Sequence, residues 1–291
     1  MAQLGQMERT PDIPLVPGDV INNERLVEIF LCSSQGGMRR SLKTGTLVVV
    51  SNHVSSFYGD RWEQNTLYYT GMGQVGDQSL AGNQNKTLFE IKTNGVRVHL
   101  FEVFKKGRYT YVGEVELGAL PFQEKQPDVD HNMRSTWVFP IVLKSGGEPL
   151  AVSLGDFRSV QDIHAKKVSK YSDSQLLALL PAEGNKPSKR ATQSYEYCRD
   201  PHVVTAALRR AKGICQLCDS PAPFIKKDGT PFLEVHHIQS LSEGGEDTLR
   251  NCVALCPNCH RKVHALKKPT DLKKLIFAAS NHGVYTSIEC S

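Results

Sequence analysis

The chain has 291 residues, of which 22% are charged and 40% are hydrophobic, and its net charge is +5. This composition excludes a wholly disordered chain, and the length allows two domains with separate cores. No run approaches the roughly 18 apolar residues that span a bilayer, and the N-terminus lacks the basic-then-apolar pattern of a secretory signal. We therefore expect a cytoplasmic protein with no membrane partner.

Residues 1–145 are expected to form a mostly-β domain. From residue 11 onward, short runs rich in Val, Tyr, Phe and Thr alternate with clusters of Gly, Asn, Asp and Pro, as strands alternate with turns. The runs cover residues 46–52, 65–71, 96–104, 109–117 and 136–143. Several strands with few helical stretches favour a curved sheet or barrel.

Residues 146–200 are expected to form a helical, basic linker. The segment SGGEP (145–149) breaks the strand pattern, residues 161–180 carry short helical stretches, and residues 181–194 are polar and basic. A domain boundary therefore falls between about 145 and 200.

Residues 201–291 are expected to form a second domain, which makes the whole chain a two-domain α+β protein. A helix is predicted from residue 201 and closed by Gly213, and residues 271–279 predict an amphipathic helix. Residues 201–275 contain twelve Lys and Arg against seven Asp and Glu, an excess equal to that of the whole chain. Such a basic stretch is compatible with nucleic-acid binding, although a solvated surface would also explain it.

Two Cys-x-x-Cys pairs lie in this second domain, separated by 37 residues: Cys215 with Cys218, and Cys256 with Cys259. Two residues between thiolates let both sulfurs of a tight turn reach one ion, and two such turns complete a closed tetrahedral site, usually for zinc. Such a site is structural, and a unit this small needs the metal to fold. The alternative is four unrelated buried cysteines.

The insert between the pairs and the residues that directly follow Cys259 contain histidines in a pattern suited to a second metal. His236 and His237 end a predicted strand, and His260 and His264 lie one helical turn apart. Imidazoles at i and i+4 project from one helix face, as a bidentate metal grip requires. A lone histidine is more often a packing or surface residue, but these four occupy a span of 29 residues next to the cysteine pairs.

The order of these residues resembles that of the HNH nucleases. His-His-Ile is followed by a Gly-Gly loop, by Asn251 at 14 residues after His237, and by His260 nine residues later. The cysteine-framed form resembles the C-terminal domain of McrA-type modification-dependent restriction enzymes, over residues 200–267. The resemblance implies a ββα-metal fold.

The same resemblance implies a role for each residue. His237 would be the general base, and Asn251 would brace the loop that orients it. His236, His260 and His264 would hold one divalent cation, such as Mg²⁺, Mn²⁺ or Co²⁺, beside the scissile phosphate. The alternative is a non-catalytic, zinc-containing module that only binds nucleic acid.

The other informative stretch covers residues 57–90. Tyr69-Thr70-Gly71-Met72-Gly73 ends a predicted strand in a glycine turn, Asp60 lies ten residues before Thr70, and Asp77-Gln78 and Asn85 follow. Taken alone, the pattern indicates a β-domain with a polar rim.

The stretch also resembles the SRA (SET- and RING-associated) family of modified-cytosine-binding domains, which implies an SRA/PUA-like fold. The family has a further glycine where this chain has Gln74. The implied mechanism is base flipping, with the cytosine stacked between Tyr69 and either Phe57 or Tyr58. Asp60 would accept from the 4-amino group, and Thr70 would line the space around the 5-substituent. Both 5-methyl and 5-hydroxymethyl groups remain open.

Together these features predict a type IV-like, modification-dependent DNA endonuclease, with structural zinc and a catalytic divalent metal. Its partner would be double-stranded DNA carrying modified cytosine, at the prokaryotic nucleoid, in defence against phage. Cutting both strands would require a homodimer or two binding events. One alternative keeps the nuclease but gives the N-terminal domain another target, such as unmodified DNA; the other is the non-catalytic binding protein.

Overall fold

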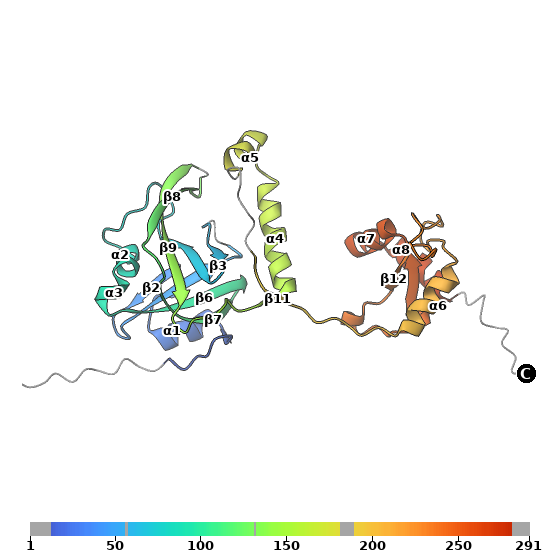
Figure 1. The fold of residues 1–291 in the computed structure, drawn as a ribbon, viewed down its shortest axis with the longest axis horizontal. Coiled ribbons are helices and arrows are strands. Elements are labelled where there is room, and N and C mark those ends of the chain that lie inside the picture. Colours follow the sequence, from blue (N-terminus) through green and yellow to red (C-terminus); the bar gives the residue numbers. More distant parts are fainter. Residues whose placement is uncertain (1–12, 56–57, 131, 181–188, 281–291) are drawn as a thin grey trace, which may run out of the picture. The chain divides into compact units, whose positions relative to one another are not determined.

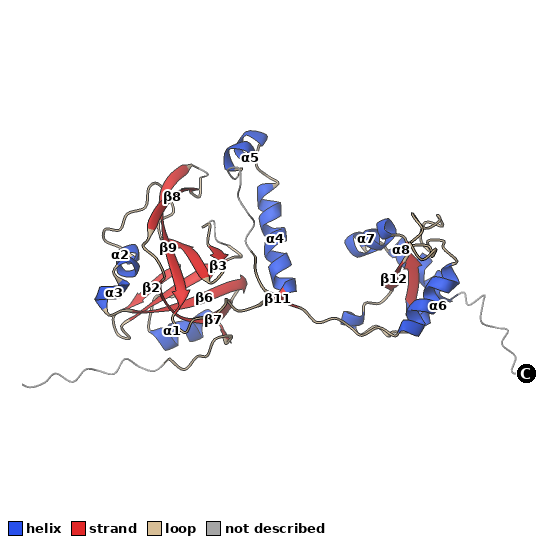
Figure 2. Ribbon diagram, in the orientation of Figure 1, coloured by secondary structure: helices blue, strands red, loops and turns tan. Residues whose placement is uncertain are grey.

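The computed structural model describes residues 13–55, 58–130, 132–180 and 189–280. Contacts divide the chain into two compact units, residues 1–194 and 195–291, each with cores of its own (Figure 1). Strands dominate the first unit, whereas helices surround a short strand pair in the second (Figure 2). The expected two-domain α+β fold is confirmed. None of the described helices is both long and apolar enough to cross a membrane.

The described part of the first unit contains a nine-stranded sheet in the order β2-β3-β6-β7-β9-β5-β4, with β1 paired to β7 and β8 paired to β9. The strands β3 and β6 run parallel, and the other pairs are antiparallel. The bounds are β1 Val20–Ile21, β2 Met38–Ser41, β3 Thr46–Asn52, β4 Arg61–Glu63, β5 Thr66–Thr70, β6 Arg97–Lys105, β7 Arg108–Leu117, β8 Phe122–Pro127 and β9 Met133–Leu143.

Each face of the sheet carries a hydrophobic cluster, and side chains that alternate along a strand enter one cluster or the other. On β3, Leu47 and Val49 belong to one hydrophobic cluster, whereas Val48 and Val50 belong to the other. This explains why the strand is an unbroken apolar run rather than an alternating one. The helix α1 (Asn23–Phe30) covers the second face, and the side chain of Asn22 caps its N-terminus.

The strand β9 bends the sheet. Its first half, residues 133–138, pairs with β8, and its second half pairs with β5 and β7. A register shift between Leu100 and Phe101 on β6 adds a further irregularity in its pairing with β7. The resulting sheet is curved, as the turn-rich sequence predicted. Two short helices, α2 (Gln84–Phe89) and α3 (Ile91–Asn94), connect β5 to β6.

The predicted linker is more ordered than expected. It contains β10 (Val152–Ser153), α4 (Leu154–Val168), α5 (Asp173–Leu179) and β11 (Thr192–Gln193), and the two short strands pair in parallel. Ser153 caps α4, and Ser172 forms a capping box with Gln175 at the start of α5. Contacts place a single division at 194/195, so residues 146–194 group with the sheet.

The second unit is built on a strand–strand–helix motif. The strands β12 (Glu234–His237) and β13 (Cys252–Leu255) pair antiparallel, and α7 (Pro257–Leu266) follows directly. The helices α6 (Pro201–Ala211) and α8 (Pro269–Ser280) pack onto β13. The positive φ of Gly213 follows the end of α6, as predicted from its sequence.

The core of this unit is small and includes two of the candidate metal-binding cysteines. Val253, Leu255 and Leu275 are buried beside Cys215 and Cys259. The hydrophobic residues alone give such a unit a modest driving force for folding.

Candidate active site and base pocket

The four cysteines converge as their spacing predicts. Their sulfurs all lie within 4.8 Å of one another, and Cys218 and Cys256 approach to 4.0 Å. Cys256 is the residue before α7 and Cys259 lies in its first turn, so the helix start fixes one pair. Hydrogen bonding to Ser220 lowers the pKa of Cys218 to about 6, whereas burial raises that of Cys259. Four thiols at this separation fit a tetrahedral zinc ion.

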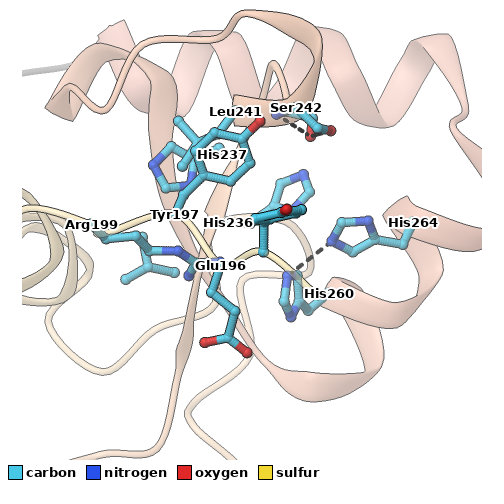
Figure 3. Close-up of a pocket in the computed structure, with 12 residues that line it drawn as sticks. Glu196, Tyr197, Arg199, His236, His237, Leu241, Ser242, His260 and His264 are labelled. Carbon is cyan, nitrogen blue, oxygen red and sulfur yellow. Dashed lines mark hydrogen bonds between the residues drawn. The ribbon is translucent and has the colours of Figure 1, made fainter. Parts of the chain in front are cut away.

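Three histidines form a second cluster. His236 lies on β12, while His260 and His264 lie on α7, and Figure 3 shows the three rings facing one another. Their ring centroids are 4.8 to 5.2 Å apart, and the Nε2 atoms of His260 and His264 are 3.1 Å apart. One nitrogen from each ring lies within 4.8 Å of the others, which fits three ligands of one cation.

The surroundings of His236 and His264 favour their neutral forms. Burial, with the neighbouring His264 and His260, lowers the pKa of His236 to about 4. Burial likewise lowers the pKa of His264, aided by His260. Glu234 contacts Nδ1 of His260 at 2.5 Å, which leaves Nε2 of that ring for a metal.

His237 lies outside the three-histidine cluster but lines the same cleft. The cleft has a volume of about 600 Å³, and His236, His260, Tyr197 and Arg199 also line it. Nε2 of His237 is 2.8 Å from Oδ1 of Asp247, whose other oxygen accepts a backbone hydrogen bond at 2.6 Å.

Asn251 closes the loop between the two strands. Its Oδ1 accepts the N–H of Gln239 at 2.9 Å, and its Nδ2 donates to the carbonyls of Gln239 and Glu246 at 3.0 and 2.8 Å. A Cβ on Gly245 would lie 2.2 Å from the Gln239 carbonyl, so only glycine fits there. Arg210 donates to the carbonyls of Leu249 and Cys252 on both sides of the loop end.

In the first unit the structure brings Asp60 and Thr70 together. Oδ1 of Asp60 accepts the backbone N–H of Thr70 at 2.8 Å, and Oδ2 accepts the Ser51 hydroxyl at 2.8 Å. Burial raises the pKa of Asp60 to about 6, although these two hydrogen bonds act in the opposite direction and lower it. The carboxylate is enclosed, although the residue as a whole keeps some exposed surface.

The aromatic candidates differ in their surroundings. Tyr69 is 4% exposed, packs in the core and donates its hydroxyl to the Gly37 carbonyl at 3.0 Å. Tyr58 donates its hydroxyl to the Gly73 carbonyl at 3.1 Å. Phe57 lies outside the described residues.

The amides that follow the glycine turn hold its shape. Nε2 of Gln78 donates to the Gly71 carbonyl at 2.6 Å, and Oδ1 of Asn85 accepts the N–H of Met72 at 2.8 Å. A Cβ on Gly71 would lie 2.7 Å from Asn85, which explains the glycine. The motif is thus one folded turn rather than separate polar residues.

Comparison with known proteins agrees with this geometry. Residues 215–266 match the family model of HNH endonucleases, and residues 17–146 match that of the ScoMcrA-like SRA domain. The two matches lie in separate parts of the chain, the SRA model in the first unit and the HNH model in the second. The chain is 41% identical over 126 residues to the type IV methyl-directed restriction enzyme EcoKMcrA of Escherichia coli strain K12, which is 43% of this chain and 44% of that one. It therefore spans less than half the length of this relative.

Among solved structures, the chain is similar to the type IV phosphorothioation-dependent restriction endonuclease ScoMcrA. The identity is 20% and the TM-score 0.40, over 91% of this chain and 63% of that one. It is also similar to the modification-dependent TagI restriction endonuclease, at 20% identity and a TM-score of 0.34, over 87% and 79% of the two chains. These structural likenesses are loose.

Several residues of these two sites were not predicted from the sequence. In the HNH unit they are Glu234 and Asp247, and in the SRA unit they are Ser51 and Gln126. Gln126 is buried and lies 3.1 Å from the Thr70 hydroxyl. Glu234 could have been found, since it precedes His236 by two residues on a strand and so shares its face.

Proposed function

We propose that this chain is a McrA-type, type IV-like restriction endonuclease that recognises a modified cytosine and hydrolyses nearby phosphodiester bonds. The observation that carries the proposal is the convergence of three imidazoles on one point, in a cleft that His237 also lines. A structural zinc finger has no need for such an open, nitrogen-only cluster beside a closed four-cysteine one.

In the nuclease unit, His236, His260 and His264 would hold a divalent cation. When bound, it would neutralise charge on the scissile phosphate and stabilise the leaving 3′-oxygen. His237 would take a proton from the attacking water. Because Asp247 holds Nε2 of His237, we assign the proton transfer to Nδ1.

Asn251 would keep that imidazole in position. Its three hydrogen bonds tie the loop after His237 to the turn before β13, which would hold the end of β12 in place. Cys215, Cys218, Cys256 and Cys259 would hold a zinc ion that fixes α7 against the loop after α6, a structural role.

In the SRA unit, a flipped cytosine would place its 4-amino group at Asp60. An ionised carboxylate accepts from that amino group, which thymine lacks. Tyr69 is fixed by its core packing and by its bond to Gly37, which suits a rigid wall for stacking, and Phe57 or Tyr58 would cover the other face. Thr70 and the neighbouring amide of Gln126 would face the 5-substituent. A polar pair accommodates hydroxymethyl as well as methyl.

The test compares otherwise identical duplexes with plain, 5-methyl or 5-hydroxymethyl cytosine, each with Mg²⁺, Mn²⁺ or Co²⁺. We expect cleavage of modified duplexes alone. Equal cleavage of all three would show a nuclease whose N-terminal domain has another target. No cleavage with any metal would support a non-catalytic binding protein. Sedimentation of the bound complex shows whether two chains act on one duplex.

A further inference from the structure

A buried carboxylate lies behind the proposed base pocket. Glu102 on β6 is 2% exposed and has three partners. It accepts the indole N–H of Trp62 at 2.9 Å, contacts Nε2 of His53 at 3.0 Å and pairs with Nη2 of Arg190 at 2.5 Å. A charge this deep is stable only when it is paired and hydrogen-bonded.

The partner Arg190 comes from far along the chain, in the segment that leads into β11. Its side chain is 7% exposed, and it also donates to the Leu150 carbonyl at 2.9 Å. The guanidinium lies over the rings of Trp62 and Phe104, at 5.4 and 5.7 Å from their centroids. The arginine side chain is therefore buried against the residues of the sheet rather than exposed on its surface.

Glu102 reaches Asp60 by two routes. Through Trp62 it fixes the short strand β4, whose first residue directly follows Asp60. Through His53, whose Nε2 lies 3.4 Å from the Ser51 hydroxyl, it reaches the group that donates to Asp60. The charge of Glu102 also acts on Asp60 directly and raises its pKa.

We propose that Arg190 is a positioning residue for modified-base recognition, acting through Glu102 on Asp60. The recognition domain would then extend to β11 and include the segment predicted to be a linker. This inference rests on the proposed function. Without Arg190, Glu102 would be left buried with too little positive charge, and Trp62 and His53 would shift to solvate it. The Asp60 carboxylate would lose the alignment that a hydrogen bond to an amino group requires.

The experiment is a double-mutant cycle in the full chain. It measures the ratio of the Kd values for plain and modified duplexes in wild type, Asp60→Ala, Arg190→Met and the double variant. We expect Arg190→Met to lower the ratio on the order of tenfold. We also expect the double variant to equal Asp60→Ala, because one residue acts through the other. The matched control is Arg97→Met, which breaks another arginine–carboxylate pair of the same sheet.

The outcomes separate the two proposals. A wild-type chain that binds both duplexes equally overturns the proposed function itself. If wild type discriminates between the duplexes, two results would overturn only the role of Arg190. One is an unchanged Kd ratio in a folded Arg190→Met variant, and the other is additive losses in the double-mutant cycle. If Arg190→Met does not fold, Glu102→Gln tests the same link, since it removes the charge and keeps the shape. An unchanged ratio in folded Glu102→Gln overturns the inference.

Discussion

Nδ1 of His260 lies 2.5 Å from Oε2 of Glu234, so this proposed metal ligand on α7 is oriented by a carboxylate from β12. Such an outer carboxylate fixes the ring and raises its basicity, and its loss typically weakens metal binding about 10- to 100-fold. We predict this loss of Mn²⁺ affinity for Glu234→Ala, measured by calorimetry with zinc kept in the cysteine site. Glu243→Ala, which removes an exposed partner of Lys267, is the control. Equal affinities in both variants would exclude the orienting role.

The four-cysteine cluster is predicted to hold one zinc ion per chain. Cys215→Ala or Cys259→Ala should lose that ion and unfold the second unit, because the remaining core is small. Elemental analysis and thermal unfolding check both effects. Cys198→Ala, at an exposed position, should retain the zinc. A Cys259→Ala variant with normal stability and full activity would contradict a structural zinc site.

Asn251→Ala removes three hydrogen bonds from the loop behind His237. At roughly 1 kcal/mol for each bond, the free energy of unfolding of the second unit should fall by about 2 to 3 kcal/mol. Cleavage should slow by about 100-fold, since a small misplacement of a catalytic group has that effect. Urea unfolding and single-turnover cleavage measure the two losses. Asn258→Ala on the exposed side of α7 should change neither.

The burial of Asp60 predicts a pH dependence. Its pKa is raised from 3.8 to about 6, so the folded chain binds this proton more tightly than the unfolded chain. The stabilisation is therefore complete below pH 3.8 and is lost as the pH rises through 6, by about 3 kcal/mol. Urea unfolding of wild type and Asp60→Asn between pH 4 and 8 measures it. The unfolding free energy of wild type minus that of Asp60→Asn should fall as the pH rises through 6. A value that does not change with pH would mean that the carboxylate is exposed to water.

The strands that were predicted have side chains buried on at least one face. The predicted run at 46–52 coincides with β3. The bounds of the runs at 96–104 and 109–117 agree with those of β6 and β7 to within one residue. The strand β8 was missed because its sequence, FQEKQP, is polar, and it pairs only along β9 within the described sheet. Its strand conformation comes from backbone pairing, which leaves no hydrophobic pattern to detect.

The candidate metal ligands could be predicted because their spacing is local. His260 and His264 share a helix face, and each cysteine pair shares a turn. Apart from Glu234, which shares a strand face with His236, the orienting groups could not be predicted, because tertiary structure brings them together: Glu102 is 88 residues from Arg190. No periodicity links residues so far apart. For the same reason the grouping of residues 189–193 with the first unit was not predicted.

The most direct test of the proposed hydrolysis is the His237→Ala variant on a duplex with 5-methylcytosine and Mn²⁺. Binding and strand cleavage are measured on the same sample. We predict wild-type affinity for the duplex and cleavage slowed by about 10²- to 10⁴-fold, the usual contribution of a general base. Cleavage at the wild-type rate by this variant would contradict the assignment of His237 as the base.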